Sequence, residues 1–353
     1  MPSIRIDLRS DTRTAPTPAM RRAMSEAEVG DEQSGDDPTV RELEATAAEI
    51  FGTEAALFLA SGTMGNLVGL LTISRRGDAV IIDSISHMAI SEGGGYATLA
   101  GCTLLPVETG GVMTAEHVRT QLGPVTPNST RPGVIWTENT HNRRGGVPSG
   151  PDVIRELAGV AAEHGLKIHI DGARIFNAAV AFDVPVAELV KGADTVQVCL
   201  TKGLGAPFGS MLLGTADGIT AARRQRQIVG GGMRQAGVMA AAGLIALRHG
   251  PARLAADHQR AKLLGTILED IEGVRLGFPV ATNLVFFWVD DRVIDPVAFA
   301  DTVTDQGLGI GGPRPGNQFR LVTHHQLSDA DIDEAGEIIV QAAEASRVGA
   351  GIA

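Results

Sequence analysis

The sequence has very little cysteine, and it has no long apolar run and no excess of positive charge. The two cysteines, Cys102 and Cys199, are too few for a disulfide framework and fit no metal-binding spacing, so we expect both to be buried and inert. No run approaches the roughly 18 apolar residues that cross a bilayer, and the N-terminus lacks a signal-peptide core. The formal net charge of −11 argues against non-specific nucleic-acid binding. We therefore expect a soluble, cytoplasmic protein without metal, membrane or nucleic-acid partners.

What remains is an ordinary globular composition, with 44% hydrophobic and 20% charged residues. A chain of 353 residues, at roughly 150 residues per domain, predicts about two domains. Short apolar runs followed by helical periodicity predict an α/β fold with a mostly parallel sheet. The predicted strands cover residues 55–60, 79–83, 104–107, 133–137, 166–171, 195–200 and 211–214.

Helix signals lie between these strands. Asp37 and Pro38 predict the cap and first turn of a helix whose apolar residues continue to Phe51, and Gly52 ends it. The N-terminal 37 residues read as an extended arm, a short helix around residues 19–24 and a loop. The basic run at 223–226 is typical of a solvated helix face.

A second, smaller domain is predicted near the C-terminus. From about Val274 the pattern changes to short strands at 283–289 and 319–322 and helices at 297–306 and 329–343. We predict an N-terminal arm and large domain over residues 1–248 and a small α/β domain over residues 249–353, without a long linker.

Several reactive side chains follow predicted strands. They are Lys202, Asp171, His87, His141 and the turn Ser61-Gly62-Thr63. Ligands of open α/β sheets bind outside the carboxyl ends of strands, so these groups can converge on one crevice. The turn at the start of a helix suits a phosphate, although capping alone also explains it. Each lone residue has an ordinary structural explanation as well: a surface lysine, a salt-bridged aspartate or a structural histidine.

Together these groups are the parts of a pyridoxal phosphate site. Lys202, with glycines around it at a strand end, can form a Schiff base if burial depresses its pKa. Asp171 can face the ring nitrogen and keep it protonated, which makes the ring an electron sink. The sequence therefore predicts pyridoxal 5'-phosphate as the cofactor.

At this point the chain resembles the low-specificity L-threonine aldolases, fold-type I pyridoxal phosphate enzymes related to β-eliminating lyases. The resemblance covers nearly the whole chain in order. The matching motifs are Asp7-Leu-Arg-Ser-Asp-Thr12, Gly35-Asp-Asp-Pro38, Ser61-Gly-Thr63, Glu138-Asn-Thr-His-Asn142, Asp171-Gly-Ala-Arg174, Thr201-Lys-Gly-Leu-Gly205, Gly230-Gly-Gly-Met-Arg234 and Arg320-Leu-Val-Thr-His324. It implies an aspartate aminotransferase-like large domain and a homo-oligomer, dimer or tetramer, with its active site at the subunit interface.

The resemblance also implies residue roles. Lys202 would bind the cofactor, Asp171 its ring nitrogen, Gly62 and Thr63 its phosphate, and His87 its ring face. Arg174 and Arg320 would hold the substrate carboxylate, with help from Ser10, and Arg174 is also assigned to cofactor binding. His141 would lie at the substrate hydroxyl, and Arg234 would reach the cofactor phosphate from a neighbouring subunit.

The implied reaction is retro-aldol cleavage of L-threonine, L-allo-threonine or a related β-hydroxy-α-amino acid to glycine and an aldehyde. His141 or His87 would be the base, since imidazole titrates near neutral pH. Ser34 stands where many relatives have tyrosine, and Gln227 where a basic residue is expected, which favours a bulkier substrate. The alternatives are β-elimination, transamination or aldol transfer with the same cofactor, or a binding protein without turnover.

Overall fold

The computed structural model describes residues 3–124 and 126–348 and divides into two compact units. The smaller unit joins the residues up to Thr14 to those from Ala252 onward, and the larger unit runs from Ala15 to Pro251. The sequence placed a boundary at 248/249, close to the second of these limits. The sequence also grouped the N-terminal arm with the large domain, whereas residues 3–14 cluster with the C-terminal unit.

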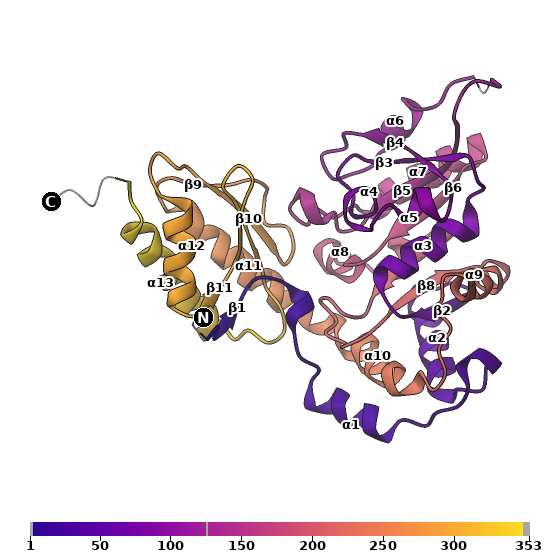
Figure 1. Cartoon of the computed structure of the whole chain (residues 1–353), viewed down its shortest axis with the longest axis horizontal. Helices are drawn as coiled ribbons and strands as arrows, with labels where there is room; N and C mark the ends of the chain where they lie inside the picture. Colours follow the sequence, from indigo (N-terminus) through magenta and orange to yellow (C-terminus); the bar gives the residue numbers. More distant parts are fainter. Residues whose placement is uncertain (1–2, 125, 349–353) are drawn as a thin grey trace. The chain divides into compact units, whose positions relative to one another are not determined.

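The larger unit contains a seven-stranded sheet (Figure 1). In spatial order its strands are β2 (Ala55–Leu59), β8 (Ser210–Gly214), β7 (Thr195–Cys199), β6 (Lys167–Asp171), β5 (Arg131–Glu138), β3 (Asp78–Asp83) and β4 (Thr103–Val107). All neighbouring pairs are parallel except those of β8, which runs antiparallel to both β2 and β7. Strands β3, β7 and β8 are buried along their whole length, as expected when helices cover both faces of a sheet. The α/β, mostly parallel prediction is confirmed.

Caps set the helix limits of this unit. Asp37 Oδ1 accepts from Val40 N at 3.0 Å at the start of α2 (Pro38–Phe51), and Gly52, with φ of 62°, ends it as predicted. The other helices are α1 (Pro18–Glu26), α3 (Gly62–Ile73), α4 (His87–Ser91), α5 (Gly95–Thr98), α6 (Ala115–Arg119), α7 (Pro151–His164), α8 (Ile175–Phe182), α9 (Ala216–Ile228) and α10 (Gly237–His249), with 3-10 turns at Glu32–Ser34, Asn142–Arg144 and Val186–Leu189.

The smaller unit packs helices on a four-stranded sheet (Figure 1). The antiparallel strands, in spatial order, are β12 (Gly311–Arg314), β13 (Gln318–Val322), β10 (Leu284–Val289) and β9 (Val274–Leu276). Its helices are α11 (Leu254–Glu269), α12 (Pro296–Asp305) and α13 (Asp329–Ala345), and a 3-10 turn lies at Asp11–Arg13. Another 3-10 turn, Pro251–Arg253, begins at the last residue of the larger unit. Phe287, Phe299 and Phe319 are fully buried in the core between sheet and helices.

The N-terminal arm is a strand of this smaller unit. β1 (Ile6–Asp7) pairs in parallel with β11 (Leu308–Gly309), and Val322 N donates to Leu8 O at 2.8 Å. Ile6 and Leu8 are buried in the core of the smaller unit, so burial of these apolar side chains holds the arm there.

Within the described residues, no helix is long and apolar enough to cross a membrane.

Candidate active site

The carboxyl ends of five strands meet at one edge of the large sheet. β3, β5 and β6 are parallel neighbours, and β2 and β7 share their direction because both run antiparallel to β8. The residues predicted for chemistry follow these ends: Asp171 closes β6, Lys202 follows β7, His87 follows β3, His141 follows β5 and the Ser61 turn follows β2. The structure thus puts all five on the same edge.

Asp171 is buried, and both its carboxylate oxygens have donors. Oδ1 accepts from Ala173 N at 3.1 Å, and Oδ2 accepts from Asn66 Nδ2 at 3.0 Å. The Gln197 amide satisfies its surroundings when its nitrogen faces Asp171 Oδ1 at 3.2 Å. These hydrogen bonds hold the carboxylate in one orientation at the edge of the sheet.

His87 lies beside the same carboxylate. Its Nδ1 is 2.7 Å from Glu92 Oε1, and its backbone N–H donates to Glu138 Oε2 at 2.8 Å. The Glu92 hydrogen bond raises the pKa of His87, the Asp171 charge adds to this, and the Lys202 charge opposes it. Both Asp171 and Lys202 therefore lie within electrostatic range of the imidazole.

Lys202 differs from the other lysines of the chain. It is half-buried in the loop after β7, whereas Lys167, Lys191 and Lys262 are exposed. The loop is compact, because Gly205 N donates to Lys202 O at 2.9 Å and Ala206 N to Leu200 O at 2.9 Å. Of the four lysines, Lys202 alone follows a strand at the shared edge.

The turn before α3 has the features of an anion site. Ser61 Oγ accepts from Met64 N at 3.2 Å, which leaves the N–H groups of Gly62 and Thr63 in a first turn where the helix offers no acceptor. A Cβ on Gly62 would lie 2.7 Å from Cys199 Sγ, so the close packing of α3 against β7 requires glycine there. Thr63 is exposed, so its N–H is open to a ligand.

His141 is almost fully buried and faces Asp83. The distance from His141 Nε2 to Asp83 Oδ1 is 3.3 Å, and Asp83 also accepts from Ile85 N at 2.9 Å and Thr109 N at 3.1 Å. Burial lowers the pKa of His141, but the Asp83 and Glu138 carboxylates raise it by more. The same contacts hold the pKa of Asp83 well below its usual range although burial opposes them.

The arginines and Ser10 are spread over both units. Arg174 is buried at the start of α8. Arg234 is exposed, and its Nη1 lies 2.8 Å from Asp31 Oδ2. In the smaller unit Arg320 of β13 donates from Nη2 to Arg9 O at 3.0 Å, and Ser10 caps the following 3-10 turn.

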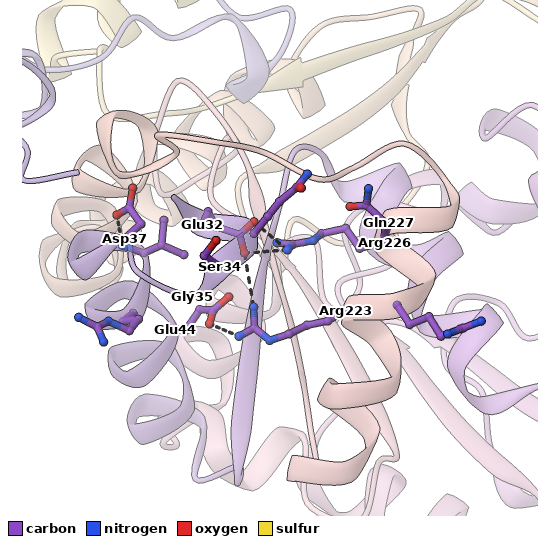
Figure 2. A pocket seen from close by; sticks show the side chains of 12 residues that line it. Glu32, Ser34, Gly35, Asp37, Glu44, Arg223, Arg226 and Gln227 are labelled. Carbon is purple, nitrogen blue, oxygen red and sulfur yellow. Dashed lines mark hydrogen bonds and ion pairs between the residues drawn. The ribbon is translucent and has the colours of Figure 1, made fainter. Parts of the chain in front are cut away.

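A cavity of about 690 Å³ lies elsewhere in the larger unit, between the 32–35 turn, α2 and α9 (Figure 2). Arg226 binds Glu32 through Nη2 at 2.7 and 2.8 Å, and Arg223 bridges Glu32 and Glu44. The basic run is therefore only partly solvated, because Arg226 is buried against a carboxylate. Ser34 and Gln227 line this cavity, and of the described residues predicted to act in the chemistry none does.

Five polar residues of the site were not singled out by the sequence reasoning: Asn66, Asp83, Glu92, Glu138 and His169. Asp83 and Glu138 close strands β3 and β5, so their place at strand ends was a usable signal. Asn66 lies four residues after Gly62 on α3, and His169 two residues before Asp171 on the same face of β6. Glu92 had no signal of this kind.

Comparison with known proteins adds the family. The beta-eliminating lyase family matches residues 7–292. The chain is 42% identical over 337 residues to low-specificity L-threonine aldolase 1 of Arabidopsis thaliana, covering 93% of each chain. It is also 42% identical to the low specificity L-threonine aldolase of Escherichia coli, covering 93% of this chain and 96% of that one.

The fold has solved counterparts. A threonine aldolase of Leishmania major superposes with a TM-score of 0.83 at 19% identity, covering 96% of this chain and 99% of that one. The predicted fold and family are thereby confirmed. The chain belongs to the pyridoxal phosphate-dependent beta-eliminating lyase family and is a homologue of the low-specificity L-threonine aldolases.

Proposed function

We propose that the protein is an aldehyde-lyase that cleaves L-threonine, L-allo-threonine or a related β-hydroxy-α-amino acid into glycine and an aldehyde. The observation that carries this proposal is the group formed by Asp171, His87 and Lys202 at one sheet edge. The names and near full-length similarity of the relatives support it.

The residues present fit pyridoxal phosphate. A half-buried amine, a hydrogen-bonded carboxylate and the free N–H groups of a helix start are the donor set that its aldehyde, ring nitrogen and phosphate need. We assign Lys202 to the aldehyde carbon, Asp171 to the ring nitrogen, Gly62 and Thr63 to the phosphate, and His87 to the ring face. When bound, the cofactor accepts the electron pair left by the breaking Cα–Cβ bond.

The substrate carboxylate is assigned to arginines. A guanidinium binds a carboxylate through two parallel hydrogen bonds, which fixes orientation as well as position. We assign this role to Arg174 and Arg320, with Ser10 contributing a hydroxyl, on the likeness of their motifs to the family. Arg174→Lys and Arg320→Lys keep the charge but lose the fork, so KM should rise by at least tenfold in each.

His141 is the candidate base at the substrate hydroxyl. Asp83 Oδ1 lies 3.3 Å from Nε2, so a carboxylate next to the imidazole stabilises its protonated form. Because the pKa of His141 is raised, the base form is lost as pH falls through that raised value. Asp83→Asn should move the acidic limb of the kcat/KM profile to lower pH; an unmoved limb would leave His87 as the base.

The remaining proposals concern assembly and location. We propose a homo-oligomer, dimer or tetramer, in which Arg234 serves the phosphate of a neighbouring subunit, and we keep the predicted cytoplasmic location. Mixing Lys202→Ala with Arg234→Ala subunits tests the first part: activity should return on mixing, because some sites regain both residues. Mixed subunits that stay inactive while assembling normally would contradict it.

Two measurements separate the alternatives. A visible absorbance spectrum after adding the cofactor, in wild type and Lys202→Ala, tests cofactor binding. Product analysis then identifies the reaction, since only an aldolase yields glycine plus aldehyde, whereas β-elimination yields ammonia and a keto acid. Ser34 and Gln227 line the cavity between the 32–35 turn, α2 and α9, and a clear preference for threonine over phenylserine would count against the bulkier substrate that these two departures favour.

A further inference from the structure

A chain of buried polar groups leads away from Asp171 into the sheet. Asn66 Nδ2 donates both to Asp171 Oδ2 at 3.0 Å and to Glu92 Oε1 at 2.7 Å. On the other side Asn66 Oδ1 is 3.1 Å from His169 Nε2, and His169 Nδ1 is 2.9 Å from Thr195 Oγ1. Asn66, His169 and Thr195 are each at most 2% exposed, so water does not compete for these bonds.

The hydrogen bonds determine which nitrogen of the His169 imidazole carries the proton. Two carboxylates require the NH2 group of Asn66, so its oxygen must face His169 and can only accept. His169 therefore carries its proton on Nε2, and Nδ1 accepts from the Thr195 hydroxyl. Burial lowers the pKa of His169 to about 4, which agrees with a neutral ring.

Packing holds the ring in place. His169 stacks on Trp136 with ring centroids 4.0 Å apart. On the α3 side, a Cβ on Gly69 would lie 2.6 Å from His169 Cε1, so glycine lets the helix approach the ring. The imidazole cannot turn without displacing α3 or Trp136, and the bond to Asn66 is therefore directional and rigid.

The Asn66 amide lies between two carboxylates, those of Glu92 and Asp171. Glu92 and Asp171 would repel each other if both were ionised, and the pKa of Glu92 is raised by burial and by the Asp171 charge. A shared NH2 group between them offsets part of this repulsion and determines which oxygen of each is engaged. The Asn66 NH2 group thus orients both Glu92, which contacts His87, and Asp171, which is assigned to the ring nitrogen of the cofactor.

We propose that Asn66 and His169 are positioning residues: His169, held by Thr195, sets the orientation of the Asn66 amide, which holds the Asp171 carboxylate aimed at the cofactor. This rests on the proposed function of Asp171. The competing explanation is that His169 only fills space between α3 and Trp136.

Two substitutions at one position separate these explanations. His169→Gln keeps a side-chain N–H donor for Asn66 but loses the aromatic stack, whereas His169→Phe keeps the stack but loses the donor. Positioning predicts that Phe weakens cofactor binding to the apoprotein by about tenfold or more, the effect of losing a buried bond to a charged network, and that Gln stays within about threefold. Space filling predicts the reverse order.

The measurements are the pyridoxal phosphate dissociation constant, the pH titration of the visible band of the bound cofactor, and thermal unfolding of each apoprotein. Thr195→Val should shift the titration in the same direction as His169→Phe but less, and it covers the case in which the position 169 variants do not fold. Thr72→Val is the matched control, because it removes a hydroxyl from α3, the helix that carries Asn66, where Thr72 donates to Val68 O at 2.7 Å and does not contact the chain of polar groups.

Equal cofactor affinities for the Phe and Gln variants, or a Thr195→Val titration identical to that of Thr72→Val, would overturn the inference. Wild type that binds no cofactor would instead overturn the proposed function, so the two failures are distinguishable.

Discussion

Two buried aspartates, one in each unit, have opposite surroundings. Asp171 and Asp257 are 2% and 1% exposed. Asp171 accepts from donors on both oxygens, whereas neither oxygen of Asp257 has a hydrogen bond among the described residues, and Arg260 Nη1 is 3.8 Å away. Burial accordingly raises the pKa of Asp257 to about 6, against the arginines near it. The two carboxylates therefore differ in the number of their hydrogen-bond donors and not in the extent of their burial.

The largest expected effect is a difference in activity between the Asp171 and Asp257 variants. Asp171→Asn should lower kcat/KM by roughly 10²–10³-fold, because a preorganised charge at the proposed ring nitrogen is lost. Asp257→Asn should stay within about threefold, since that carboxylate has no assigned role. Equal losses in the two variants, measured as aldehyde released from L-threonine, would break the comparison.

The second effect is on stability in acid. The pKa of His169 is lowered from 6.5 to about 4, so the unfolded chain binds the proton more readily and stability falls as pH drops from 6.5 to 4. The full loss is about 3 kcal/mol for this fully buried ring. The free energy of unfolding of the apoprotein, measured with urea at several pH values, should depend less steeply on pH in His169→Gln than in wild type. The same pH dependence in both proteins would rule out a neutral buried His169 ring.

The third effect has the opposite sign. The pKa of Asp257 is raised from 3.8 to about 6, so the folded chain retains the proton longer and stability falls as pH rises from about 4 through 6. Asp257→Asn should therefore raise the free energy of unfolding at pH 8 by about 1–2 kcal/mol, less than the whole shift because the new amide is also buried without partners. No gain in the free energy of unfolding at pH 8 would show that the Asp257 carboxylate has donors after all.

The smallest effect provides a baseline. Arg155 Nη1 lies 2.6 Å from Asp152 Oδ1 on the surface of α7, and the arginine side chain is 71% exposed. Exposed pairs contribute little, so Arg155→Ala should change the free energy of unfolding by less than about 0.5 kcal/mol. A loss comparable to the pH effects above would mean that the buried groups are not special.

The sequence correctly predicted those helix limits and strands that depend on residues close together in the chain. Asp37 with Pro38 started α2, Gly52 ended it, and the apolar runs became the strands that bring Asp171 and Lys202 to one edge. Local patterns cannot pair side chains far apart in the chain, such as Asn66 with Asp171, which are 105 positions apart. For the same reason the burial of Arg226 was not foreseen.

The pairing of the N-terminal arm is also a contact between distant parts of the chain, here between backbone groups, that local patterns do not predict. β1 is two residues long and pairs with β11, about 300 positions later, so no periodicity marks it. The alternating buried residues in and next to it, Ile6 and Leu8, are too few to predict a strand. Their contribution emerges only once the smaller unit has formed its core.

The central claim is that one amine, that of Lys202, holds the cofactor. The chain has four lysines, Lys167, Lys191, Lys202 and Lys262. Borohydride reduction of the reconstituted enzyme, followed by peptide mapping by mass spectrometry, fixes the cofactor to the amine that carries it. The account predicts a single modified peptide containing Lys202. Modification of any other lysine, or none under conditions where aldehyde is still released, would contradict it.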